Sequence, residues 1–262
     1  MTEESIEDLV IYEHTSEHVA RITLNRPAKL NTITPAMGVR VAELVRQVND
    51  DDAVRVVVLT GTGPKSFCAG SDVSALDQYG TSWQLRNRVD YARAIGNVRK
   101  PVIAAIDGYA FGGGLELALF SDIRLATPTS TFCAAEIKLG WHGGAGATQL
   151  LPRIIGYGNA LQLLLTGDRL SAAEACAMGL VQRVVEPEVL LSEADALAAR
   201  IAANAPIAAQ YAKHLVRVSM STSLEIGLGY ENDTFVYEHG TQDAAEGRAA
   251  FAERRPPQFT GE

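Results

Sequence analysis

Apolar residues in the first half of the chain form short runs that alternate with segments of helical periodicity. The runs at residues 54–60 (VRVVVLT), 101–106 (PVIAAI) and 122–126 (DIRLA) are rich in β-branched residues and almost continuous. This pattern is typical of strands that are buried on both faces. Residues 20–25 (ARITLN) alternate apolar and polar side chains and stop before a proline, which predicts a further strand.

Helices are expected between these strands. Thr34 followed by Pro35 is typical of an N-cap and the first helical position, and apolar residues then recur at helical spacing over residues 37–48. A second helix is predicted from the spacing of Leu85, Val89, Ala92, Ile95 and Val98. Strands that are joined by helices of this length pair in parallel through right-handed crossovers.

The pattern changes after about residue 145. Ser171 and Glu174 form a capping-box sequence, and Gly179 stands where a helix C-cap is expected. Residues 181–185 predict one last short strand.

From residue 190 to residue 252 almost everything reads as helical, with interruptions expected at Pro206 and at residues 227–229. The chain is therefore expected to hold an α/β core over residues 1–200 and a C-terminal helical region over residues 201–262. No flexible linker separates them, so the helical region is expected to pack on the core or on a neighbouring subunit.

Composition and charge restrict the class of protein. Of the 262 residues, 47% are apolar and 21% are charged, as in a soluble globular protein. No apolar run reaches the ~18–20 residues that span a bilayer, and the polar, acidic start does not resemble a signal peptide. A net charge of −8 argues against a nucleic-acid partner. Three cysteines without metal-ligand spacing favour free thiols in a cytoplasmic protein.

Several familiar motifs are absent. Residues 61–66 (GTGPKS) have a proline where a phosphate loop needs its second glycine, and residues 156–161 (GYGNAL) do not complete a dinucleotide fingerprint. Ser71 is not in a nucleophile-elbow sequence, and the five histidines lack the spacing of a metal site. We therefore expect no metal.

A glycine turn is the first positive signal for chemistry. Gly112, Gly113 and Gly114 follow a predicted buried strand and open an apolar helix. Glycines there leave backbone N–H groups unshielded, and the helix dipole adds partial positive charge. The amides of Gly113 and Ser71 could together form an oxyanion hole. The alternative is that the glycines only allow the helix to pack closely on the sheet.

Two glutamates stand in apolar surroundings near this turn. Glu116 lies three residues after Gly113, and Glu136 precedes Ile137 in a second apolar segment. Each could be a capping or salt-bridged carboxylate. If both are buried and close together, their pKa values are raised and separated, so one can act as an acid and the other as a base.

These residues resemble the crotonase superfamily, the enoyl-CoA hydratase/isomerase family. The similarity extends from about residue 10 to residue 259. It rests on residues 25–31 (NRPAKLN), 67–72 (FCAGSD), 106–122 (IDGYAFGGGLELALFSD), 135–140 (AEIKLG), 165–168 (LTGD), 179–181 (GLV) and 251–255 (FAERR).

The resemblance implies a spiral core of repeated ββα units and C-terminal helices for trimerisation, in a homotrimer or a dimer of trimers. It implies an acyl-CoA substrate, with CoA entering as part of that substrate and no separate cofactor. It places the oxyanion donors at Ser71 and Gly113. Glu116 and Glu136 match the two catalytic glutamates of the hydratases. Their retention favours addition of water to a 2-enoyl-CoA.

The resemblance also suggests residues that contact the substrate. CoA-binding candidates are Lys65, Cys68, Ala69, Gly70 and Lys29, with Lys29 shifted by one position from the matching family lysine. Trp141 and His142 stand where many hydratases have a proline-containing loop, and they are candidates for the acyl pocket. Surface or packing roles are the alternatives for these side chains. Another reaction of the superfamily (double-bond isomerisation, a specialised dehydration or thioester hydrolysis) and a non-catalytic acyl-CoA-binding protein also remain possible.

Overall fold

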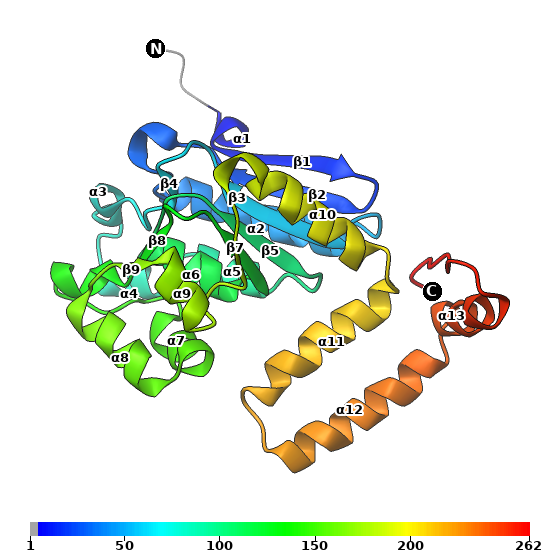
Figure 1. The fold of residues 1–262 in the computed structure, drawn as a ribbon. Helices are drawn as coiled ribbons and strands as arrows, with labels where there is room; N and C mark the ends of the chain where they lie inside the picture. Colours follow the sequence, from blue (N-terminus) through cyan, green and yellow to red (C-terminus); the bar gives the residue numbers. More distant parts are fainter. Residues whose placement is uncertain (1–4) are drawn as a thin grey trace.

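The computed structural model describes residues 5–262, and its centre is a six-stranded sheet (Figure 1). The strand order is β1-β2-β3-β5-β7-β10, with β1 antiparallel to β2 and the others parallel. The strands are β1 (Val10–Ser16), β2 (Val19–Leu24), β3 (Val56–Gly61), β5 (Val102–Ile106), β7 (Ile123–Ala126) and β10 (Arg183–Val184). The expected strands are therefore present with shifted ends, and β1 is an addition to them.

A second sheet of four short strands lies beside the first and has the order β4-β6-β8-β9. Its strands are β4 (Ser66–Cys68), β6 (Tyr109–Phe111), β8 (Thr131–Cys133) and β9 (Leu170–Ser171). The strands β3, β5 and β7 of the large sheet are each followed along the chain by a strand of the small one. This repeated strand pair followed by helical segments is the spiral of ββα units that the sequence resemblance implied.

Helices cover both faces of the large sheet. The helices and 3₁₀ turns of this part are α1 (Ile6–Leu9), η1 (Pro27–Lys29), α2 (Pro35–Asp50), α3 (Val73–Leu76), α4 (Ser82–Arg86), α5 (Tyr91–Gly96), α6 (Gly113–Phe120), η2 (Ala135–Leu139), α7 (Ala147–Ile155), α8 (Tyr157–Thr166), α9 (Ala172–Ala177), η3 (Pro187–Val189) and α10 (Leu190–Ala202). Val57 and Leu59 of β3 pack in the cluster that includes α2, whereas Val56 and Val58 pack in the cluster that includes α10. Successive side chains of a strand point to opposite faces, so one continuous apolar strand joins two core layers.

The caps expected from the sequence are present. The Thr34 side chain accepts a hydrogen bond from Met37 N at 3.3 Å, with Pro35 at the start of α2. Ser171 and Glu174 form a complete capping box at α9.

The predicted helix through residues 85–98 is wrong in one respect, because the chain breaks it in two. Helix α4 ends at Arg86 and α5 begins at Tyr91. The Asp90 side chain accepts a hydrogen bond from Arg93 N at 2.9 Å, which caps a new helix. The break leaves Val89 exposed while Ile95 remains in the core.

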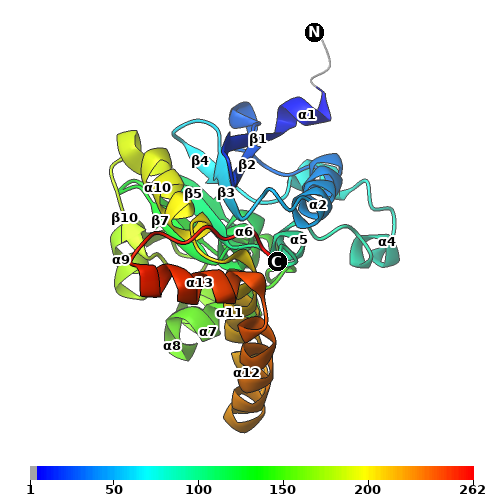
Figure 2. The same cartoon turned by 90° about the vertical axis from the view of Figure 1, so that its right-hand side faces the viewer.

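The last three helices extend away from the sheets (Figures 1 and 2). They are α11 (Pro206–Ser219), α12 (Leu224–His239) and α13 (Gln242–Glu253). Pro206 begins α11, as expected, but the predicted interruption at residues 227–229 is wrong because α12 runs through both glycines. Among residues 5–262, no helix has the length and apolar character that crossing a membrane requires.

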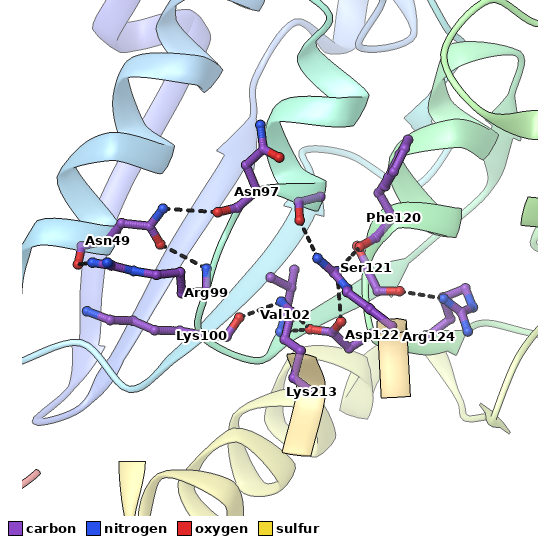
Figure 3. A network of polar contacts seen from close by, with 12 residues as sticks. Asn49, Asn97, Arg99, Lys100, Val102, Phe120, Ser121, Asp122, Arg124 and Lys213 are labelled. Atoms are coloured by element: carbon purple, nitrogen blue, oxygen red, sulfur yellow. Dashed lines mark hydrogen bonds and ion pairs between the residues drawn. The ribbon is translucent and has the colours of Figure 1, made fainter. Parts of the chain in front are cut away.

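Ion pairs attach α11 to the core at the end of α6 (Figure 3). Lys213 Nζ lies 2.6 Å from one carboxylate oxygen of Asp122, and Arg217 Nη2 lies 3.0 Å from the other. Lys213 also donates to the carbonyl of Lys100 at 2.7 Å. Burial lowers the pKa of Lys213 to about 8, although the neighbouring Asp122 carboxylate opposes this shift.

Candidate active site

The glycine turn forms the N-terminus of α6. Gly112 donates its N–H to the carbonyl of Cys133 at 2.9 Å, and its φ of 52° lies in the left-handed region. A Cβ at Gly113 would overlap the Tyr91 hydroxyl, and a Cβ at Gly114 would overlap the carbonyl of Cys68. The absence of side chains at Gly113 and Gly114 therefore allows α6 to pack closely on Tyr91 and on β4, as the packing interpretation of these glycines expected. In the part of the chain that the structure describes, the Gly113 N–H has no acceptor.

Ser71 brings a second amide beside the first. Ile33 N donates to the carbonyl of Gly70 at 2.8 Å and Asp72 N donates to the carbonyl of Ile33 at 2.9 Å, but the Ser71 N–H has no acceptor among residues 5–262. A Cβ at Gly70 would lie 3.1 Å from Gly113 N, so the two turns are in contact. Two unpaired amides thus lie close together at one end of α6.

Tyr91 is a residue of this site that the sequence analysis missed. Its hydroxyl lies 2.9 Å from Ser71 Oγ and packs against Gly113. Burial, together with the neighbouring Cys68 and Glu116, raises the pKa of Tyr91 well above its ordinary value. The phenol therefore stays neutral and links the two segments that carry the free amides. No feature of the sequence marked it, because a tyrosine within a predicted helix is common.

Glu116 is buried one turn into α6, with 3% of its surface exposed. Its Oε1 accepts hydrogen bonds from Ala145 N at 2.7 Å and Ala147 N at 3.1 Å. Burial raises the pKa of Glu116 to about 7, against the two hydrogen bonds and with a smaller contribution from the carboxylate of Glu136. A carboxyl group with such a pKa can both accept and release a proton near neutral pH.

Glu136 approaches the same turn from η2. A Cβ at Gly112 would lie 3.1 Å from Glu136 Oε1. Glu136 Oε2 is buried and has no hydrogen-bond partner among the described residues. Burial raises the pKa of Glu136 above its ordinary value, while its own backbone N–H and His142 oppose the shift. Both glutamates that the sequence singled out therefore flank the glycine turn, and neither is salt-bridged within residues 5–262.

The loop at residues 140–146 wraps around Glu116. A Cβ at Gly143 would lie 2.9 Å from Glu116 Oε1. Trp141 is 44% exposed and His142 is exposed, with its Nδ1 2.7 Å from the carbonyl oxygen of Gly143. Their role in an acyl pocket stays a prediction.

The residues predicted to bind CoA lie on two loops that a buried asparagine joins. Asn31 Nδ2 donates to the carbonyls of Thr62 and Ser66 at 3.0 and 2.7 Å, so η1 is held against the start of β4. Lys29 and Lys65 are exposed at the two sides of this junction. Cys68, Ala69 and Gly70 continue from it toward Ser71, and burial raises the pKa of the Cys68 thiol to about 12. Their role in binding CoA also stays a prediction.

A small cavity of about 20 Å³ lies beside Ser71. Its walls include Ile33, Leu76, Tyr79, Arg88, Val89 and Tyr91. Five of these six residues come from the segment that runs from the end of α3 to the start of α5, and the sequence did not predict the helix break in this segment.

Comparison with known proteins shows the family of this chain. Residues 14–262 match the profile of the family described as enoyl-CoA hydratase/isomerase. The chain is 39% identical over 251 residues to crotonyl-CoA hydratase of Syntrophomonas wolfei, which covers 93% of the chain and 95% of that relative. It is 40% identical over 248 residues to (E)-benzylidenesuccinyl-CoA hydratase of Thauera aromatica, covering 94% of the chain and 97% of that relative.

Solved structures of enoyl-CoA hydratases share the fold of this chain. The crystal structure of an enoyl-CoA hydratase from Bacillus anthracis matches with a TM-score of 0.92 and 38% identity, over 97% of this chain and 100% of the other. A structure from Streptomyces coelicolor matches with a TM-score of 0.91 and 34% identity, over 97% and 94%. With the fold, the glycine turn and both glutamates in place, the chain belongs to the enoyl-CoA hydratase/isomerase family of the crotonase superfamily.

Proposed function

We propose that the protein catalyses the reversible addition of water to a 2-enoyl-CoA thioester, giving a 3-hydroxyacyl-CoA. The observation that carries this proposal is the pair of glutamates on either side of one glycine turn, with Glu116 buried and Glu136 half-buried. A single buried carboxyl group can supply a base or an acid, but water addition to a conjugated double bond needs both at neighbouring carbons. Two of the relatives above are a crotonyl-CoA hydratase and an (E)-benzylidenesuccinyl-CoA hydratase, which supports the same chemistry.

The amides of Ser71 and Gly113 would hold the thioester oxygen. Negative charge grows on that oxygen as water attacks Cβ, and donors that are already in place stabilise this charge without reorganisation. Removal of one such donor typically lowers the rate by ~10²–10³-fold. Because Gly113 is at the N-terminus of α6, the helix dipole adds to the effect.

The two carboxyl groups would share one water molecule. In hydration Glu116 acts mainly as the base, taking a proton while the oxygen attacks Cβ, and Glu136 acts mainly as the acid, delivering a proton to Cα. Dehydration reverses both roles. We assign the base to Glu116 because two backbone N–H groups stabilise its carboxylate form, whereas Glu136 Oε2 has no such partner among residues 5–262.

The CoA moiety would lie along the two loops that Asn31 joins. Lys65 and Lys29 can offset the phosphate charge locally although the protein is acidic overall. The backbone at Cys68, Ala69 and Gly70 would contact the adenine and the pantetheine chain. Neither a metal nor a separate cofactor enters this mechanism.

We also propose that the chain assembles through its C-terminal helices as a homotrimer or a dimer of trimers. Large apolar side chains, including Leu224, Ile226 and Val236 of α12, are 79%, 65% and 64% exposed. So many large apolar side chains exposed on one helix are uncommon on a monomer and favour a role in association.

The test is hydration of crotonyl-CoA by the purified protein, followed as loss of the conjugated thioester absorbance. Glu116→Gln and Glu136→Gln should each lower kcat by ~10²–10⁴-fold. The matched control is Glu188→Gln, which changes an exposed glutamate of η3 and should keep the rate. Chelator and added nucleotide should have no effect.

Two results would contradict the proposal. If both glutamine variants keep rates within a factor of about three of the control, the acid and base assignments are wrong. If 3-enoyl-CoA is isomerised while crotonyl-CoA is not hydrated, the protein is an isomerase of the same family.

A further inference from the structure

The cavity beside Ser71 is lined on one side by an arginine, Arg88. It borders Ser71, whose amide is one of the two proposed to hold the thioester oxygen, so a ligand assigned to this cavity rests on the proposed function. Within the described chain, Arg88 is the only cation among the residues that line it, and Asp72 is the only anion. The rest of the lining is apolar, aromatic or hydroxyl-bearing.

Arg88 reaches from the break between α4 and α5 toward the loop that holds Glu116. A Cβ at Gly144 would lie 3.1 Å from Arg88 Nη2. The preceding residue, Gly143, is the glycine that packs against Glu116. Arg88 Nη1 donates to the carbonyl of Leu85 at 2.9 Å. Arg88 is thus half-buried between the cavity beside Ser71 and the loop at residues 140–146.

No carboxylate of residues 5–262 pairs with Arg88. The two nearby acids are already occupied. Asp72 lies 2.7 Å from Arg26 Nη1 and accepts a hydrogen bond from Ser74, and Asp90 accepts the N–H of Arg93 as the cap of α5. The lining of this cavity therefore contains a guanidinium with no ion-pair partner among residues 5–262.

We propose that Arg88 selects short 2-enoyl-CoA thioesters whose acyl chain ends in a carboxylate. A guanidinium presents two parallel N–H donors that match both oxygens of a carboxylate, and a charged pair of this kind is stronger where water is partly excluded. A cavity of about 20 Å³ holds about one water molecule, so any acyl chain that enters it must move part of the lining. A long alkyl chain gains no polar partner when it does so, whereas an anionic end group on a short chain gains one from Arg88.

The test compares two five-carbon substrates that differ at one end. trans-Glutaconyl-CoA ends in a carboxylate, and trans-2-pentenoyl-CoA ends in a methyl group. The ratio of their kcat/KM values should favour glutaconyl-CoA in the wild type and fall about tenfold or more in Arg88→Met. Arg88→Lys should lie between them because it keeps the charge but loses the paired donors. Arg86→Met is the matched control, since this exposed arginine at the end of α4 makes no ion pair within the described residues.

A binding experiment separates failure of this inference from failure of the proposed function. The saturated thioesters glutaryl-CoA and pentanoyl-CoA cannot be hydrated, and calorimetry gives their Kd for each variant. If the wild type hydrates crotonyl-CoA while Arg88→Met changes neither the kcat/KM ratio nor the Kd ratio, the role of Arg88 is refuted and the hydratase stands. If no enoyl-CoA is hydrated but glutaryl-CoA binds more tightly through Arg88, the hydratase proposal fails and the specificity inference stands.

Discussion

The reactivity proposed for this site depends on one glutamate in an apolar helix. Glu116 is kept in a core where its neighbours are buried aliphatic residues, and within the described chain its carboxylate is stabilised only by the amides of Ala145 and Ala147. Placing a carboxylate there is unfavourable for folding, because burial penalises its charged form. The same penalty moves its pKa to about 7 and makes it a usable base at neutral pH.

This pKa predicts how activity depends on pH. A base works only when ionised, so kcat/KM for crotonyl-CoA should fall about tenfold per pH unit below 7 and level off above it. Burial also raises the pKa of Glu136, so its protonated form persists to a higher pH than that of a glutamate in water. Initial rates between about pH 5 and 9, with circular dichroism to confirm folding, check this prediction. A flat profile over that interval would contradict the assignment of Glu116.

The contact between Gly113 and Tyr91 gives a second prediction at this scale. In Gly113→Ala the new methyl group must displace the Tyr91 hydroxyl, so the turn shifts and the free amide moves. We expect kcat to fall ~10²-fold or more, as for loss of an oxyanion donor. Gly158→Ala is a suitable control because a Cβ there meets no atom within 4 Å. Equal rates for the two variants would show that this amide has no part in catalysis.

The sequence identified the glycines and glutamates for a physical reason, and it missed Tyr91 and Arg88 for another. A glutamate among leucines and a triple glycine are locally improbable, so each is visible without neighbours. Tyr91 and Arg88 are ordinary in their own segment, and only the fold brings them against Gly113 and Gly144. Side chains that matter through long-range contact leave no periodic signal.

At the scale of the elements, the length of a strand decided whether the sequence could predict it. Buried strands such as β3 and β5 have five or six residues that are mostly apolar or β-branched, which is enough to recognise them. Strands β4, β6 and β8 have three residues each, too few for an alternating pattern to appear. The helix break before α5 was missed because apolar spacing continued through it, although Asp90 could have marked the cap.

The attachment of α11 gives a prediction at the element scale (Figure 3). Asp122→Asn leaves the buried ammonium of Lys213 without its counter-charge and should cost about 3–5 kcal/mol of unfolding free energy. Lys213→Met removes the buried charge itself and should cost less. Urea denaturation measures both values.

The double variant Asp122→Asn/Lys213→Met separates this account from simple loss of packing. It should be more stable than Asp122→Asn alone, because the unpaired ammonium is no longer present. If the two single changes add, the pair makes no specific contribution to the position of α11.

At the scale of the whole molecule, the C-terminal helices leave a groove and many apolar side chains exposed. A groove of about 500 Å³ separates residues 96–99 from α11 and α12, and Tyr211, His214 and Tyr237 line it. Together with the exposed apolar side chains of α12, this surface is suited to a second copy of the chain.

Assembly can be tested by placing charge on that surface. The double variant Ile226→Glu/Val236→Glu should shift the mass in solution from a trimer or hexamer toward a monomer, as measured by light scattering. Val39→Glu/Val189→Glu is the matched control, because both valines are partly exposed on other elements, at 44% and 43%. A wild type that is already monomeric, or an unchanged mass in the helix variant, would contradict assembly through α12.

One turn of α6 carries both the amide of Gly113 and the carboxylate of Glu116. Three residues along a helix correspond to about 4.5 Å of rise, so this spacing is fixed by backbone geometry and not by loop motion. Glu136 and residues 140–146 belong to separate segments and can vary independently. On the proposed mechanism, a change of reaction would therefore leave the spacing between Gly113 and Glu116 intact and act through the segments that face them.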